Sequence, residues 1–201
     1  MSDLTNLPHD ITPADFFKLV NETLANEPAP DNARPEKAQF TLEGDGGGTW
    51  VSGFSDGRLV IEEGTTETPP VALTLSVDAW RAFVAGPVRD ALKEHVDQTL
   101  IDPSQLSKLY ESADKVDQVM ALKGTLAVVI ENDGTDYSAL LTTGGISPDA
   151  ANPTAKVSMT LPDFVTIASG QENPQMAFFS GKIRVEGDMN HVMGLFALTI
   201  S

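Results

Sequence analysis

Cysteine is absent from this sequence of 201 residues. Without cysteine the chain can form no disulfide, no thiolate metal site and no cysteine nucleophile. The absence also fits a reducing compartment, so we expect a cytoplasmic protein. The first residues, Met1 to Pro8, agree with this expectation because they lack the basic region and apolar stretch of a secretory signal.

Positive charge is scarce as well. The 13 Lys and Arg residues face 29 Asp and Glu residues, which gives a formal net charge of −16, and no basic block compensates for it. We therefore expect no nucleic-acid partner, because phosphate binding depends on clustered Lys and Arg. The same excess opposes adsorption to anionic membrane surfaces. No apolar run approaches the roughly 18 residues of a membrane span, so we expect no stable membrane insertion.

Residue patterns for catalysis are also missing. Residues 53–57 spell Gly-x-Ser-x-Gly, but they precede a predicted strand and are typical of a hairpin turn rather than of a nucleophile elbow. His9, His95 and His191 are far apart, without partners at metal or triad spacing, so we expect each to lie on the surface. We predict that the protein is not an enzyme and that it needs no metal and no cofactor.

What the chain does contain is enough apolar sequence for a core, since 41% of its residues are hydrophobic. Residues 12–24 predict a helix, because a threonine cap and a proline begin it and Phe16, Val20 and Leu24 share one face. Further helices are predicted over 77–85, with Gly86 as a left-handed stop, and over 88–120, with a break near 102–103. Strands are predicted at 40–43, 50–51, 58–62, 71–75 and 126–130.

The second half of the chain repeats part of the first. With a shift of 84 residues, the segment from Val71 to Gly86 lies over the segment from Ala155 to Gly170, each with a strand, a cap, an aromatic residue and a glycine. Upstream, residues 42–46 resemble residues 130–134 at a shift of 88. The pattern indicates either a true duplication or two copies of a common strand–helix unit.

A family resemblance is carried by the C-terminal part of the chain. The stretch Leu161-Pro-Asp-Phe164 to Gly170 is followed by Asn173-Pro-Gln-Met-Ala-Phe-Phe-Ser-Gly-Lys-Ile-Arg-Val-Glu-Gly-Asp-Met189. This stretch resembles the C-terminal signature of the sterol carrier protein-2 (SCP2) family. The resemblance covers about residues 123–201, and the first half resembles a weaker, truncated copy.

The resemblance implies an α+β fold, SCP2-like, with a largely antiparallel sheet and helices packed on one face that enclose an apolar cavity. Residues 1–120 would form a partial SCP2-like repeat with N-terminal and connecting helices. Residues 121–201 would form the SCP2-like lipid-binding body, with one continuous domain as the alternative. The implied cavity takes sterols, fatty acids or acyl chains.

The predicted function is non-enzymatic binding and carriage of a lipid. The predicted lipid-binding residues are apolar and concentrated near the C-terminus, and the alternative interpretation is that they are plain core. They are Phe164, Ile167, Met176, Phe178, Phe179, Ile183, Val192, Leu195 and Phe196. The alternative function is a protein-interaction module on the same scaffold without a cavity, which binds a protein partner or a second copy of the chain.

Overall fold

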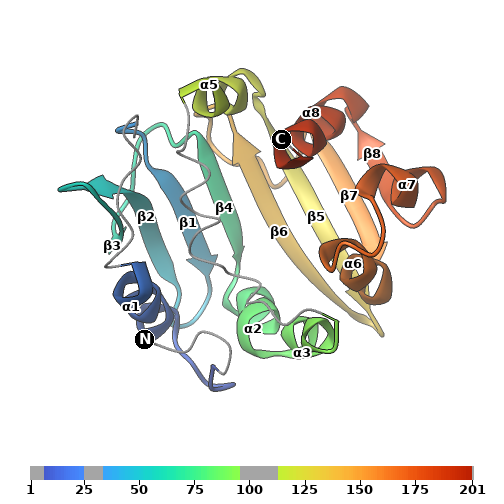
Figure 1. Ribbon diagram of the computed structural model, residues 1–201, viewed down its shortest axis with the longest axis horizontal. Helices are drawn as coiled ribbons and strands as arrows, with labels where there is room; N and C mark the ends of the chain where they lie inside the picture. Colours follow the sequence, from blue (N-terminus) through green and yellow to red (C-terminus); the bar gives the residue numbers. More distant parts are fainter. Residues whose placement is uncertain (1–6, 25–33, 96–112, 201) are drawn as a thin grey trace.

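The computed structural model describes residues 7–24, 34–95 and 113–200. These residues contain an eight-stranded sheet with the order β3-β2-β1-β4-β6-β5-β7-β8 (Figure 1). The strands are β1 (Ala38–Glu43), β2 (Gly48–Ser55), β3 (Arg58–Glu63), β4 (Val71–Ser76), β5 (Gly124–Asn132), β6 (Thr135–Thr143), β7 (Ala155–Thr160) and β8 (Arg184–Gly187).

Strand pairing in the sheet is mostly antiparallel. Only the β1–β4 and β5–β7 pairs are parallel among the strands described. Strand β4 of the first half pairs with β6 of the second, so strands from both halves lie in one sheet. The predicted α+β fold with a largely antiparallel sheet is confirmed. The predicted domain division at residue 120 stays a prediction.

Two hairpins of the sheet turn on Asp-Gly pairs. Asp56 and Gly57 connect β2 to β3 with φ values of 50° and 74°, and Asp133 and Gly134 connect β5 to β6 with 42° and 87°. Positive φ at both central residues is the requirement of the type I′ turn, whose twist matches that of the strands. The serine at position 55 therefore lies beside a hairpin turn, as predicted.

The helices pack on one face of the sheet (Figure 1). In β5, Leu126 and Ile130 are buried against them, whereas the preceding Thr125 hydrogen-bonds Thr142 of β6 through the two hydroxyl groups at 3.2 Å. The helices are α1 (Pro13–Leu24), α2 (Val77–Ala85), α3 (Pro87–Lys93), α5 (Ala113–Ala121), α6 (Leu161–Ala168), α7 (Pro174–Phe179) and α8 (Met189–Ile200).

Two groups of buried apolar residues fill the space between sheet and helices. The N-terminal cluster joins α1 and α2 to β1–β4 and is rich in aromatic rings: Phe17 and Trp50 lie 4.6 Å apart between ring centroids. The C-terminal cluster lies under α3, α6, α7 and α8. Its buried members are Ala82, Val88, Leu92, Leu126, Ile130, Ala155, Val157, Met159, Leu161, Val165, Ala177, Ile183, Val192 and Leu195.

The two parallel strand pairs share one arrangement. Leu42 is the register partner of Leu75, and Ile130 is the register partner of Met159. These four residues correspond under the sequence shifts of 88 and 84. Each pair leads into a capped helix, because the hydroxyl oxygens of Ser76 and Thr160 accept hydrogen bonds from the first turns of α2 and α6. Duplication itself stays a prediction.

The prediction of a left-handed stop at Gly86 is wrong. Its φ of −142° is extended, and the residue both ends α2 and begins α3. A side chain there would be crowded, since a Cβ would lie 3.0 Å from Ala82 Cα and 3.1 Å from the Arg81 carbonyl oxygen. The helix predicted over 88–120 is observed as α3 and α5, and its predicted break lies outside the described residues.

Candidate functional site

The candidate site is the apolar layer between β5–β7 and the C-terminal helices. Ile183, Val192 and Leu195, all predicted for lipid binding, are buried inside the C-terminal cluster. The other predicted residues that contact this cluster are half-buried. They are Phe164, Ile167, Phe178 and Phe196. The structure therefore brings seven of the nine predicted residues together in one layer.

The remaining two predicted residues lie outside this layer. Met176 is 61% exposed and Phe179 is 79% exposed, both on α7. The buried face of this short helix is formed by Ala177, which has no exposed surface. The periodicity of α7 therefore directs two large apolar side chains away from the cluster.

The start of α8 explains the Gly-Asp-Met signature in physical terms. Gly187 has a φ of +88°, and a Cβ on it would lie 2.6 Å from the Thr154 carbonyl oxygen. Asp188 then donates its backbone N–H to that oxygen at 2.9 Å, while its carboxylate accepts a hydrogen bond from Asn190 N at 2.8 Å. Glycine thus allows the close turn, and aspartate caps the helix that covers the site.

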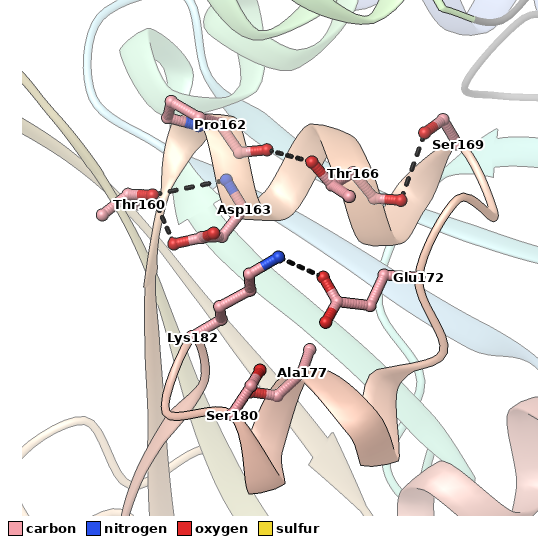
Figure 2. Close-up of polar contacts among 9 residues, drawn as sticks. All are labelled: Thr160, Pro162, Asp163, Thr166, Ser169, Glu172, Ala177, Ser180 and Lys182. Atoms are coloured by element: carbon pink, nitrogen blue, oxygen red, sulfur yellow. Dashed lines mark hydrogen bonds and ion pairs between the residues drawn. The ribbon is translucent and has the colours of Figure 1, made fainter.

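Helix α6 is capped at its N-terminus (Figure 2). The Thr160 hydroxyl accepts a hydrogen bond from Asp163 N at 3.3 Å and donates one to the Asp163 carboxylate at 2.7 Å. Within the helix, the Thr166 hydroxyl donates to the Pro162 carbonyl oxygen at 2.8 Å. The bonds between Thr160 and Asp163 fix where α6 begins.

An ion pair closes the loop around α7 (Figure 2). Lys182, after α7, binds the carboxylate of Glu172, which lies before it. The hydrogen bond with Glu172 raises the pKa of Lys182, and the Asp163 carboxylate contributes in the same direction. The backbone N–H of Lys182 also donates to the Ala177 carbonyl oxygen at 2.9 Å. The chain before α7 is therefore tied to the chain that follows it.

His191 lies in the packing between α8 and the strands, so the prediction of a surface position is wrong for this histidine. The residue is only 5% exposed, and its Nε2 has no hydrogen-bond partner among the described residues. Burial lowers the pKa of His191, and the Asp188 carboxylate opposes this shift. The ring occupies the space left by Gly124, where a Cβ would lie 2.6 Å from His191 Cε1.

Two hollows lie away from the predicted lipid-binding residues. One, of about 660 Å³, lies at the tip of the β5–β6 hairpin beside α3 and α6 and carries the carboxylates of Glu94, Glu131, Asp133 and Asp136. The other, of about 530 Å³, lies beside α1, β2 and β3. None of the nine predicted residues lines either hollow. The larger hollow reaches the C-terminal cluster only through Leu161 and Val165 of α6 and the partly buried Ala91 of α3.

Within residues 7–24, 34–95 and 113–200, no group of three or more His, Asp or Glu side chains is arranged to hold a metal ion. No helix in them has both the length and the apolar character needed to cross a bilayer.

The apolar layer between β5–β7 and the C-terminal helices lies in a segment that matches a known protein family. Residues 104–199 match the SCP-2 sterol transfer family. The match contains α5, β5–β8 and α6–α8, which carry the candidate site. We call residues 104–199 the SCP-2 segment, and the SCP2 resemblance is confirmed for it. It supports a lipid-binding or lipid-transfer domain in general terms. The second copy predicted in the first half lies outside the match.

Solved structures with similarity to the chain include two carriers and an enzyme. Sterol carrier protein 2 like 2 from Aedes aegypti is 20% identical over 38% of this chain and 73% of its own, with a TM-score of 0.35. Sterol carrier protein 2 from Yarrowia lipolytica, in its apo form, is 17% identical over 58% and 90%, with a TM-score of 0.35.

A stereoselective inverting sec-alkylsulfatase from Pseudomonas sp. is 22% identical over 41% of this chain and 14% of its own, with a TM-score of 0.33. No curated protein matches the chain.

Sequence reasoning located the cluster through its apolar residues and the SCP-2 signature. It missed the burial of His191, although the sequence held a usable signal. Helix α8 has no charged residue and is largely apolar, so a histidine among its apolar side chains can be buried with them.

Proposed function

We propose that the SCP-2 segment binds the hydrocarbon part of a lipid without catalysing a reaction. The lipid would lie between β5–β7 and helices α6, α7 and α8, in contact with Phe164, Phe178 and Phe196. The observation that carries this proposal is the family match over residues 104–199, combined with the half-buried aromatic side chains on that segment. An acyl chain or a sterol has the chemistry that such a layer accepts.

Half-buried side chains matter because they can move apart without breaking the backbone framework. Transfer of each methylene from water then contributes about 0.8 kcal/mol, so a long acyl chain offsets the cost of opening the layer. The framework is held independently by the helix caps and by the Lys182–Glu172 ion pair. No metal or cofactor is needed for this binding.

Titration with a soluble fluorescent fatty-acid analogue tests the proposal. The wild-type chain should bind it, and Phe178→Ala or Phe164→Ala should weaken binding about tenfold, because each removes an apolar contact worth on the order of 1 kcal/mol. Phe54→Ala is the matched control, since Phe54 is half-buried against the N-terminal cluster. It should leave the affinity unchanged.

A second candidate function is protein interaction without a bound lipid. It is favoured by the close packing of the C-terminal cluster, in which Ala177 and Val192 have no exposed surface, and because none of the nine predicted lipid-binding residues lines either hollow. A folded wild-type chain that ignores the fatty-acid analogue would favour this candidate over lipid carriage.

A further inference from the structure

Large apolar side chains reach solvent mainly from α7 and α8. In the part of the chain that the structure describes, five such side chains are exposed, and four of them lie on these two helices. Met176 and Phe179 of α7 are 61% and 79% exposed, and Met189 and Met193 of α8 are each 37% exposed. We call these four residues the exposed α7–α8 set. Large apolar groups that are exposed together, as Met176 and Phe179 are on α7, mark an interaction site.

Helical spacing places the two members of each pair on the same face of their helix. Met176 and Phe179 are three residues apart on α7, and Met189 and Met193 are four apart on α8, so each pair shares one helix face. Methionine adapts to irregular apolar surroundings, and phenylalanine offers a large apolar area. Neither pair includes a side chain that would specify a fixed polar partner.

Charge is balanced in this part of the chain. Lys182, just after α7, pairs with Glu172, and Arg184 pairs with Glu131, so each of these two cations is matched by one carboxylate. The side chains of residues 173–201 sum to zero charge, so the formal net charge of −16 comes from the residues before them. A neutral apolar surface on an acidic molecule fits an uncharged partner surface and is repelled by an anionic one.

The exposed set is continuous with the candidate lipid site. The rings of Phe178 and Phe179 lie 5.6 Å apart between centroids, and Phe178 packs against the C-terminal cluster while Phe179 faces solvent. An apolar path thus runs from the surface of α7 to the layer in which we propose that a lipid binds.

We propose that the exposed α7–α8 set docks the chain transiently on the surface of a zwitterionic bilayer, with Phe179 and Met176 in the interfacial region. This docking rests on the proposed lipid function, because it brings the membrane to the lipid site. A second copy of the chain fits less well, since two molecules that each carry −16 repel one another.

Vesicle flotation tests the docking. The wild-type chain should float with phosphatidylcholine vesicles, and the double variant Met176→Ser, Phe179→Ser should lower the bound-to-free ratio about tenfold. Ile146→Ser is the matched control, because Ile146 is the fifth exposed apolar residue and lies in the loop between β6 and β7, not on α7 or α8. It should bind as the wild type does, and circular dichroism should show all three chains folded. Phosphatidylserine in the vesicles should reduce wild-type binding.

Three outcomes would overturn the docking: a wild-type chain that stays unbound, equal flotation of wild type and double variant, or a native dimer that only the double variant dissociates. The last outcome would assign the surface to a second copy instead. The soluble fatty-acid titration of the wild type separates the two proposals. Binding of that probe without flotation refutes the docking alone, whereas flotation without probe binding refutes the proposed function alone.

Discussion

His191 places a titratable ring inside the packing of α8 against the strands. Its Nε2 is buried without a partner among the described residues, and the space it fills exists because residue 124 is glycine. A neutral imidazole tolerates this position at the cost of one missing hydrogen bond, whereas an imidazolium there would be a poorly solvated charge. Protonation of His191 should therefore weaken the packing of α8 against the strands, so the stability of the folded chain depends on pH.

The sign of this coupling follows from the direction of the pKa shift. Burial lowers the pKa of folded His191 below its ordinary value of 6.5, so below that pH the unfolded chain binds a proton that the folded chain does not. The free energy of unfolding should therefore fall as the pH drops below about 6.5, with a slope of at most about 1.4 kcal/mol per pH unit from this residue. Above that range the contribution is constant.

Urea unfolding between pH 7.5 and 5.5 measures the slope. His191→Gln should flatten it, because glutamine does not titrate. His95→Gln at an exposed position of the described chain should leave it as in the wild type. Equal slopes for the wild type and His191→Gln would show that this ring is not the titrating group.

At the scale of single elements, the ends of most helices and hairpins are determined by residues that are neighbours in the sequence. Thr160 and Asn173 cap α6 and α7, and each precedes a proline within the first helical turn, so the helix starts could be predicted from the chain alone. Asp56-Gly57 specifies its turn in the same local way. These features depend on neighbours in sequence, which is why sequence reasoning found them.

Features that depend on distant contacts could not be predicted. Gly86 was expected to end α2 through its backbone conformation, but its backbone is extended and a Cβ there would crowd Ala82 and Arg81 of α2. The exposure of Phe179 follows from which face of α7 meets the sheet, and a six-residue helix is too short to show that face as a period. The contacts of His191 with Gly124 join residues 67 positions apart.

At the scale of the whole molecule, the β4–β6 pairing joins the two halves. Residues 71–75 of β4 pair with residues 139–143 of β6, and the helices of both halves lie on the same face of the sheet (Figure 1). A sheet continuous through its centre should transmit loss of packing from one cluster to the other. We therefore expect the described core to unfold as one cooperative unit.

The tryptophans report on this cooperativity because both belong to the N-terminal cluster. Leu195→Ala removes a buried side chain from the C-terminal cluster and should cost about 2–5 kcal/mol of unfolding free energy. If the two clusters unfold together, the fluorescence transition of Trp50 and Trp80 should shift to lower urea along with the circular dichroism transition. An unshifted fluorescence transition, with an earlier step seen by circular dichroism alone, would show that the halves unfold separately.

The central claim is that the C-terminal layer holds a lipid. Native mass spectrometry of protein purified without detergent, before and after equilibration with a long-chain fatty acid, tests it most directly. We predict a population heavier than the bare chain by one lipid, with the heavier fraction reduced in Phe178→Ala and retained in Phe54→Ala. A folded chain that stays at its bare mass after equilibration would contradict the claim and would favour the protein-interaction function.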